Sequence, residues 1–126
     1  MHTPENLKYT RSHEWLEILE GGAARVGITD YAQSKLGDIV FVNLPEAGDE
    51  VEAGGRLADV ESVKAVSDIF SPAAGRVRAA NDALADAPEM INQSPYEAWL
   101  AELEDVGETQ QLLDAAAYAA FCEEEG

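Results

Sequence analysis

The chain has 126 residues, of which 25 are acidic and only 8 are lysine or arginine, so its formal net charge is −17. That length suits a single domain spanning residues 1–126, with one hydrophobic core. The charge argues against a nucleic-acid partner, which requires clustered Lys and Arg, and against an anionic membrane surface. A strongly acidic surface favours partners with basic patches, although solubility alone would also explain it.

The N-terminus and the cysteine content bear on the compartment. Residues 1–15 lack the apolar core of a signal peptide and are not rich in Arg and Ser like an organelle presequence. The stretch 115–122 is too short to cross a bilayer, and the single cysteine, Cys122, excludes an internal disulfide. We therefore expect a cytoplasmic protein, with a processed organelle form as the alternative.

The first elements in chain order are a hairpin and a short helix. Apolar-rich runs over 15–19 and 24–28 flank Glu20-Gly21-Gly22, and paired glycines supply the positive φ angles of tight turns. A helix is then predicted over about 30–36, between a candidate cap at Thr29 or Asp30 and a glycine, Gly37.

Strands dominate the middle of the chain, and a helix ends it. The run 39–42, Ile-Val-Phe-Val, is typical of a strand that is buried on both faces. From Asp114 an Ala-rich stretch predicts a terminal helix, whose last residues, Glu123 to Glu125, oppose the helix dipole and should fray. Further short strands are expected over 50–53, 56–63, 66–70, 75–79 and 99–103.

Lys64 is the unusual residue of the central strands. A lysine in such a run is ordinarily a solvated strand residue or one that protects a sheet edge from aggregation. Val51 and Val77, each shortly after a glycine, lie equally far along the chain from Lys64. If the chain folds back at Lys64, these segments pair across a pseudo-twofold axis and the lysine occupies the tip. The alternative is coincidence, because Gly-x-x-Val is common in β proteins.

The usual signatures of an active site are absent from the sequence. His13-Glu14 lacks the second His that a zinc-binding helix would need, so no metal site is expected. Cys122 has no neighbouring His to activate it, and no glycine-rich phosphate loop occurs. What remains is Lys64, whose amine at an exposed tip could be modified without unfolding the protein.

Five stretches of the sequence stand out as specific motifs. They are L-K-Y-T-R-S-H-E-W, V-G-I-T-D-Y-A-Q-S-K-L-G-D-I-V-F-V-N-L-P, V-E-S-V-K-A-V-S-D-I-F-S-P-A-A-G, I-N-Q-S-P-Y-E-A-W and L-L-D-A-A-A-Y-A-A-F. Together they resemble a known family, that of the glycine cleavage H proteins, from about Leu7 to Glu125. The second and third stretches are specific in combination, whereas a generic lipoyl or biotinyl domain would share only the central hairpin.

This resemblance implies a fold and a cofactor. The fold would be mainly β, a flattened barrel-sandwich hybrid of the lipoyl- and biotinyl-domain type, with a short helix near residues 30–36 and a C-terminal helix. Lipoate would be attached covalently to Lys64. Val63 and Ala65 stand where biotinyl domains typically have methionines, which speaks against biotin.

The resemblance also implies a role and partners. The protein would be a non-catalytic carrier in glycine catabolism and one-carbon metabolism, moving an aminomethyl group on its lipoyl arm. A pyridoxal-phosphate glycine decarboxylase would load the arm, and a tetrahydrofolate-dependent aminomethyltransferase would unload it. A dihydrolipoamide dehydrogenase would reoxidise it, and a lipoylating enzyme would attach it. Neither nucleic acid nor membrane is among the partners.

Two other roles for Lys64 stay open. A lipoyl relay that donates lipoate for the lipoylation of other enzymes would use the same Lys64, and the sequence does not discriminate between relay and shuttle. An unmodified acidic interaction module, with Lys64 only protecting a sheet edge, is the second alternative.

Four further residues are candidates for the site. Glu61, three residues before Lys64, would help a lipoylating enzyme to place the lysine, or else is a solvated strand residue. A loaded arm ends in an amine, so a cleft that shields it should offer oxygen acceptors. The resemblance narrows these acceptors to Ser12, Glu14 and Asp68, which could instead merely solvate the surface.

One segment departs from the family pattern. Only Glu97 and Ala98 separate Tyr96 from Trp99, where the family usually has three residues with a Gly before the Trp. The backbone must take a tighter path here, which bears on any partner contact that this loop makes.

Overall fold

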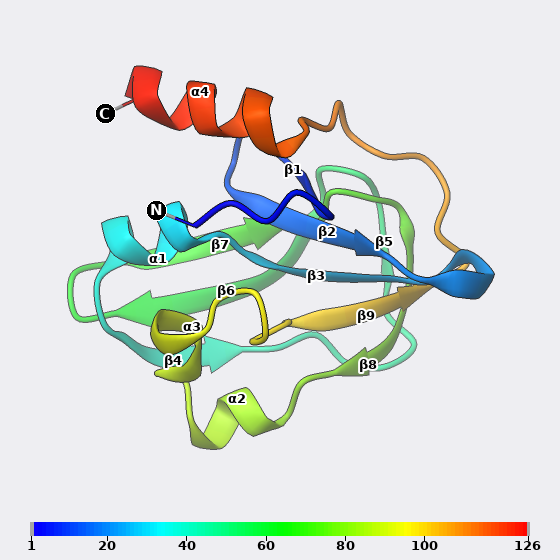
Figure 1. Cartoon of the computed structure of the whole chain (residues 1–126). Helices are drawn as coiled ribbons and strands as arrows, with labels where there is room; N and C mark the ends of the chain where they lie inside the picture. The colour runs from blue at the N-terminus through cyan, green and yellow to red at the C-terminus, as the bar shows by residue number, and fades with distance from the viewer. Residues whose placement is uncertain (1, 126) are drawn as a thin grey trace.

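Two antiparallel sheets, not closed into a barrel, make up most of the computed structural model, which describes residues 2–125 (Figure 1). The six-stranded sheet has the order β1-β2-β3-β9-β8-β5, and the three-stranded sheet the order β4-β6-β7. The expected mainly-β fold with a short helix and a C-terminal helix is confirmed. The strands of the larger sheet are β1 (Lys8–Tyr9), β2 (Glu14–Ile18), β3 (Ala24–Ile28), β9 (Ala101–Glu104), β8 (Gly75–Ala80) and β5 (Glu50–Val51). Those of the smaller sheet are β4 (Ile39–Asn43), β6 (Arg56–Ser62) and β7 (Val66–Phe70).

The helices lie at the margins of the sheets. α4 runs along β1 and β2 at the top of Figure 1, whereas α2 and α3 lie near β4 on the opposite side of the molecule. None of the helices within residues 2–125 is both long and apolar enough to cross a membrane. Their bounds are α1 (Asp30–Leu36), α2 (Ala83–Asp86), α3 (Met90–Gln93) and α4 (Ala115–Glu125), with a 3-10 turn over Glu20–Gly22.

Local signals explain the hairpin and α1, both of which are confirmed. Gly21 and Gly22 have φ angles of 72° and 75°, which bring β2 and β3 into antiparallel register. The Thr29 hydroxyl accepts a hydrogen bond from the Ala32 amide at 3.2 Å, so Thr29 caps α1 at its start. Gly37, with φ 81°, ends α1.

The expectation that 39–42 is buried on both faces is wrong. Ile39 and Val42 point into the core, but Val40 and Phe41 are 54% and 51% exposed. Two causes combine. The register between β4 and β6 shifts between Ile39 and Phe41, so the extra residue Val40 also turns outward. In addition, the outer face of the three-stranded sheet at Phe41 is not covered by any other described element.

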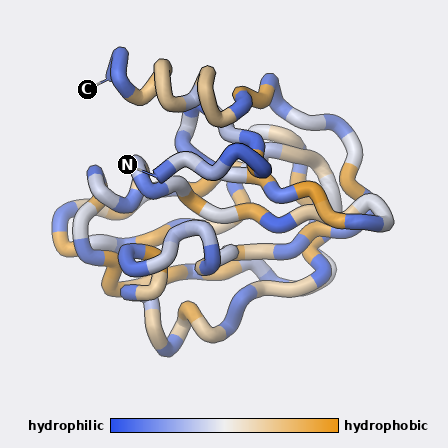
Figure 2. Tube along the Cα trace, in the orientation of Figure 1, coloured by the Kyte–Doolittle hydropathy of each residue, from blue (hydrophilic) through white to orange (hydrophobic). Residues whose placement is uncertain are grey.

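The buried residues form three clusters. One joins the inner face of β4, β6 and β7 to α2 and α3, through Leu84 and Ile91. The second lines the larger sheet, between β2, β3, β8 and β9. The third lies under α4, where the Tyr9 and Tyr118 rings stack with their centroids 4.6 Å apart and Cys122 is a buried free thiol. Hydrophobic residues are spaced along the strands of both sheets in Figure 2.

The C-terminal helix continues through Glu125, beyond the point at which fraying was expected. Figure 2 shows it weakly hydrophobic over most of its length and hydrophilic at its C-terminal end. The Glu125 carboxylate accepts a hydrogen bond from His13 Nε2 at 2.7 Å, which offsets part of the unfavourable dipole interaction.

The shortened segment before Trp99 forms a turn. The Ala98 amide donates to the Ser94 carbonyl at 2.9 Å, and the Tyr96 hydroxyl accepts from the Asp30 amide at 3.1 Å. The Trp15 indole donates to the Pro95 carbonyl at 3.1 Å. The loop is thereby held against β2 and the start of α1.

Trp15 packs so closely against Gly27 that there is no room for a side chain at position 27. The two residues are cross-strand partners, and a Cβ at position 27 would lie 2.5 Å from the buried indole. We expect Gly27→Ala to destabilise the protein by about 1–3 kcal/mol, because the hydrogen-bonded ring cannot move aside. Urea unfolding measures the change.

Gly107→Ala is the matched control. A Cβ there meets no atom within 4 Å, and we expect its free energy of unfolding to stay within about 0.5 kcal/mol of wild type. A Gly27→Ala protein as stable as this control would contradict the clash.

Candidate functional site

Lys64 lies at the tip of the hairpin formed by β6 and β7, as the sequence predicted. The register pairs Glu61 with Val66, and the outer pieces β5 and β8 also pair, Val51 with Gly75. The Ser62 amide donates to the Ala65 carbonyl at 2.8 Å, which closes the turn, and Lys64 is exposed. The two flanking segments therefore pair with each other, although Val51 lies opposite Gly75 and not opposite Val77.

The tip rests on the segment that follows α1. The Val63 amide donates to the Asp38 carbonyl at 3.0 Å. The stem of Lys64 lies so close to Gly37 that a Cβ there would be 3.4 Å from Lys64 Cε. The absence of a side chain at Gly37 thus leaves room for the lysine stem beside the end of α1.

A cavity of about 330 Å³ opens between α1, β7 and the residues before β2, and Lys64 itself does not line it. Leu36, the neighbour of Gly37, belongs to its wall, and so do Ser67, Asp68 and Ile69 of β7. The walls combine apolar and polar side chains, which suits a ligand with an apolar stem and a polar end. The other lining residues are Ser12, His13, Ile28, Tyr31, Ala32, Lys35 and Glu125.

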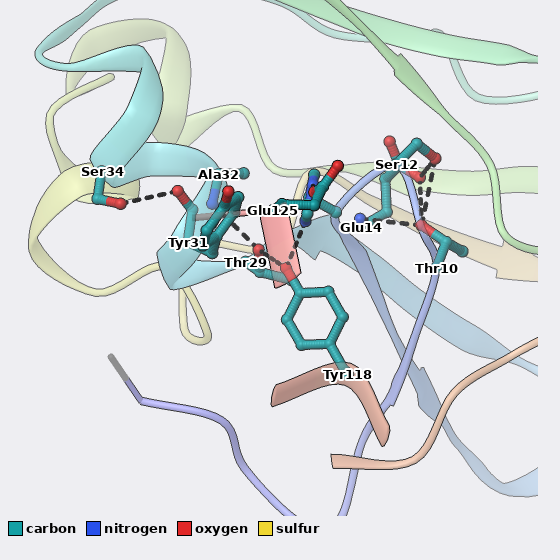
Figure 3. A network of polar contacts seen from close by, with 10 residues as sticks. Thr10, Ser12, Glu14, Thr29, Tyr31, Ala32, Ser34, Tyr118 and Glu125 are labelled. Atoms are coloured by element: carbon teal, nitrogen blue, oxygen red, sulfur yellow. Dashed lines mark hydrogen bonds and ion pairs between the residues drawn. The ribbon is translucent and has the colours of Figure 1, made fainter. Parts of the chain in front are cut away.

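Ser12 lines this cavity, and Glu14 lies behind it. The hydroxyls of Thr10 and Ser12 each donate to Glu14 Oε1 at 2.6 Å, as the dashed lines of Figure 3 show. The Phe70 amide donates to Glu14 Oε2 at 3.4 Å. Because Ser12 gives its only proton to Glu14, the lone pairs of its oxygen are left to accept a hydrogen bond from a ligand.

Burial governs the ionisation of Glu14. The side chain is 1% exposed, and this burial raises the pKa of its carboxyl above the ordinary value. Hydrogen bonds from Ser12, Thr10 and the Phe70 amide oppose the rise, because they favour the carboxylate. Glu14 does not line the cavity and acts on it through Ser12.

The other two predicted residues differ in their relation to the cavity. Asp68 lines the cavity with its side chain about half exposed, and its Oδ1 accepts from Arg56 Nε at 3.1 Å. Glu61 is exposed between Phe41 and Val66 and does not line the cavity, although the strand register puts it on the same face of the sheet as Asp68. Of the four predicted residues, Ser12 and Asp68 therefore line the cavity, Glu14 contacts Ser12, and Glu61 lies outside it.

The sequence reasoning missed His13 and Glu125, which close one end of the cavity. His13 Nδ1 lies 2.8 Å from the Tyr118 hydroxyl. This hydroxyl in turn lies 2.6 Å from Thr29 Oγ1 (Figure 3). The His13 ring also stacks on Tyr31, with centroids 4.6 Å apart. These contacts tie α4 to the rim of the cavity across nearly the whole length of the chain. Only the position of His13 beside Ser12 in the S-H-E-W stretch could have pointed to it.

Metal chemistry has no visible basis in the part of the chain that the structure describes. Residues 2–125 contain no group of three or more His, Cys, Asp or Glu side chains that could hold a metal ion.

Comparison with known proteins finds the same family along almost the whole chain. The family model described as "Glycine cleavage H-protein" matches residues 7–125. A glycine cleavage system H protein from Acidobacterium capsulatum is 54% identical over 127 residues, covering 99% of this chain and 98% of its own. A probable one from Pyrococcus furiosus is 52% identical over 120 residues, 93% of this chain and 90% of its own. The crystal structure of a glycine cleavage system H protein from Mycobacterium marinum superposes with a TM-score of 0.88 at 42% identity, covering 93% of this chain and 96% of that one.

The raised pKa of Glu14 predicts a pH dependence of stability. In the folded protein Glu14 keeps its proton to a higher pH than in the unfolded chain. Its contribution to stability is therefore complete below the unfolded pKa, about 4.3, and is lost as the pH rises to the raised folded pKa. Between the unfolded and the folded pKa, the free energy of unfolding of the wild type should therefore fall relative to that of Glu14→Gln. Urea titrations of both proteins from pH 3.5 to 8 measure this difference, and a constant difference would contradict the raised pKa.

Proposed function

The chain belongs to the glycine cleavage H-protein family, whose role is that of a lipoyl carrier, and from this membership we propose that residues 1–126 form a single carrier domain with lipoate on Lys64. The observation that carries the proposal is the position of Lys64, exposed at a hairpin tip with its stem beside Gly37, whose neighbour Leu36 lines a cavity. A lysine that only protected a sheet edge would need neither feature.

Attachment uses the amine of Lys64 as a nucleophile. The deprotonated Nζ would attack the carbonyl of a lipoyl group that a lipoylating enzyme had activated as an acyl adenylate. The C–N amide bond would form, the C–O bond to the adenylate would break, and AMP would leave while the amine proton passed to solvent. The turn over Ser62 to Ala65 presents the amine to that enzyme without unfolding.

We propose that the carrier works as a shuttle between enzymes. The chemistry that lipoate supplies when bound is a disulfide that can be opened and re-formed. The chain would move an aminomethyl group from a pyridoxal-phosphate glycine decarboxylase to a tetrahydrofolate-dependent aminomethyltransferase, and a dihydrolipoamide dehydrogenase would complete the cycle. The chain itself would be non-catalytic and cytoplasmic, and its contribution is proximity.

The cavity would shelter the loaded arm from water. Ile28, Leu36 and Ile69 supply its apolar wall. Ser12 Oγ and the Asp68 carboxylate are the acceptors that would hold the terminal amine, while Glu14 orients the Ser12 hydroxyl. This shelter favours the shuttle over a relay that passes lipoate to other proteins, because a relay has no loaded amine to protect.

Lys64→Arg tests the attachment site. The substitution keeps the charge but removes the amine, so the protein should carry no lipoyl group while its fold is unchanged. The measurements are intact mass and peptide mapping after expression in the native host. Lys35→Arg is the control and should be lipoylated like wild type, and a lipoyl group on Lys35 would contradict the proposal.

Asp68→Asn and Ser12→Ala test the shelter. Each removes one acceptor, and we expect the loaded form to decay several-fold faster in the absence of partner enzymes, as followed by mass spectrometry. Asp59→Asn is a matched control, because Asp59 pairs with Asp68 across the strands and also binds Arg56 but does not line the cavity. Equal decay in all four proteins, wild type included, would show that these residues do not protect the arm.

A further inference from the structure

Large apolar side chains gather on the outside of the molecule around Lys64. Five large hydrophobic residues are exposed in the part of the chain that the structure describes, and four of them lie here. They are Val40 and Phe41 of β4, 54% and 51% exposed, and Val63 and Val66 beside the tip, each 67% exposed. We call these four residues the tip patch; none of them lines the cavity.

The strand register makes the tip patch one continuous surface. Phe41 pairs with Glu61, and Glu61 with Val66, so these three side chains form a row across β4, β6 and β7 on one face. The register shift in β4 turns Val40 to the same side, and Val63 extends the surface to the residue before Lys64. Exposed apolar residues scattered singly need no explanation, but a contiguous group of them indicates an interaction site.

Acidic side chains lie within and beside the patch. Glu61 stands in the middle of the row, and Asp38, whose carbonyl accepts from the Val63 amide, is exposed next to the tip. The chain as a whole carries a formal charge of −17. A complementary surface would therefore be apolar at its centre and rimmed with Lys or Arg.

The position of the patch selects among the proposed partners. An enzyme that reacts with the far end of a lipoyl arm would be separated from the tip by the length of that arm. The lipoylating enzyme meets Lys64 before any arm exists, so it must draw the lysine amine itself into its active site. Its surface then has to contact the residues immediately around Lys64.

We propose that the tip patch is the docking surface for the lipoylating enzyme, which meets it with an apolar centre and a basic rim. This proposal rests on lipoate attachment at Lys64. Phe41 and Val66 are binding residues for that enzyme, and Glu61 supplies the charged contact between them.

The test is the rate at which the unlipoylated protein accepts lipoate. Phe41→Ser and Val66→Thr are incubated with a purified lipoate–protein ligase, lipoate and ATP, and intact mass follows the reaction. We expect kcat/KM to fall about tenfold in each variant, mainly through a higher KM. Glu61→Gln should raise KM at low salt, and the KM of this variant should depend less on the salt concentration than that of the wild type.

Ile18→Thr is the matched control. Ile18 is 62% exposed but lies on β2 in the other sheet, so its replacement should leave the rate unchanged. All variants should keep the urea midpoint of wild type, because the replaced side chains are exposed. Phe41→Ser protein that has been lipoylated to completion should pass its load to the aminomethyltransferase at the wild-type rate.

The outcomes separate the two proposals. Wild-type lipoylation rates in Phe41→Ser and Val66→Thr would overturn the docking surface and leave Lys64 as the attachment site. Normal lipoylation combined with defective transfer would also overturn it, since the patch would then serve another partner. Wild-type protein that accepts no lipoyl group at Lys64 would contradict the proposed function itself.

Discussion

The antiparallel pairing of β6 with β7 is the constraint on which the site depends. Side chains alternate between the two faces of a strand, so a slip of one residue would move Val60 and Ile69 from the core to solvent. The same slip would shift Lys64 from the tip and turn Asp68 to the other face. Pairing of β5 with β8 further along the same chain segments holds this register from outside the hairpin.

Two surfaces of different chemistry lie near the hairpin. Toward α1 there is a cavity lined by both apolar and polar residues. The outer face of the smaller sheet has exposed valines and a phenylalanine around an acidic centre. In the proposed carrier, the cavity would shelter a lipoyl group attached to Lys64, and the outer face would remain free for contact with an enzyme.

Burial of the polar network before β2 costs free energy, and the hydrogen bonds within the network offset that cost. A buried carboxylate such as Glu14 is unfavourable unless its oxygens are hydrogen-bonded, and two hydroxyls and a backbone amide meet this need. The amide belongs to Phe70 of β7, so the same bonds fasten the smaller sheet to the larger one. His13 and Glu125 add a second fastening, through which α4 contributes to the cavity wall.

The sequence by itself determined the hairpin at Gly21-Gly22, helix α1 and the turn at Lys64. It could do so because turn glycines, helix caps and strand patterns act over a few residues. The family resemblance, carried by long specific stretches, also placed Ser12 and Asp68 near one another. Only the tertiary structure decided that Val40 and Phe41 are exposed, that Glu14 lies behind the cavity, and that His13 meets Glu125. Burial and long-range contacts depend on which elements cover each face, and no local pattern of residues encodes that.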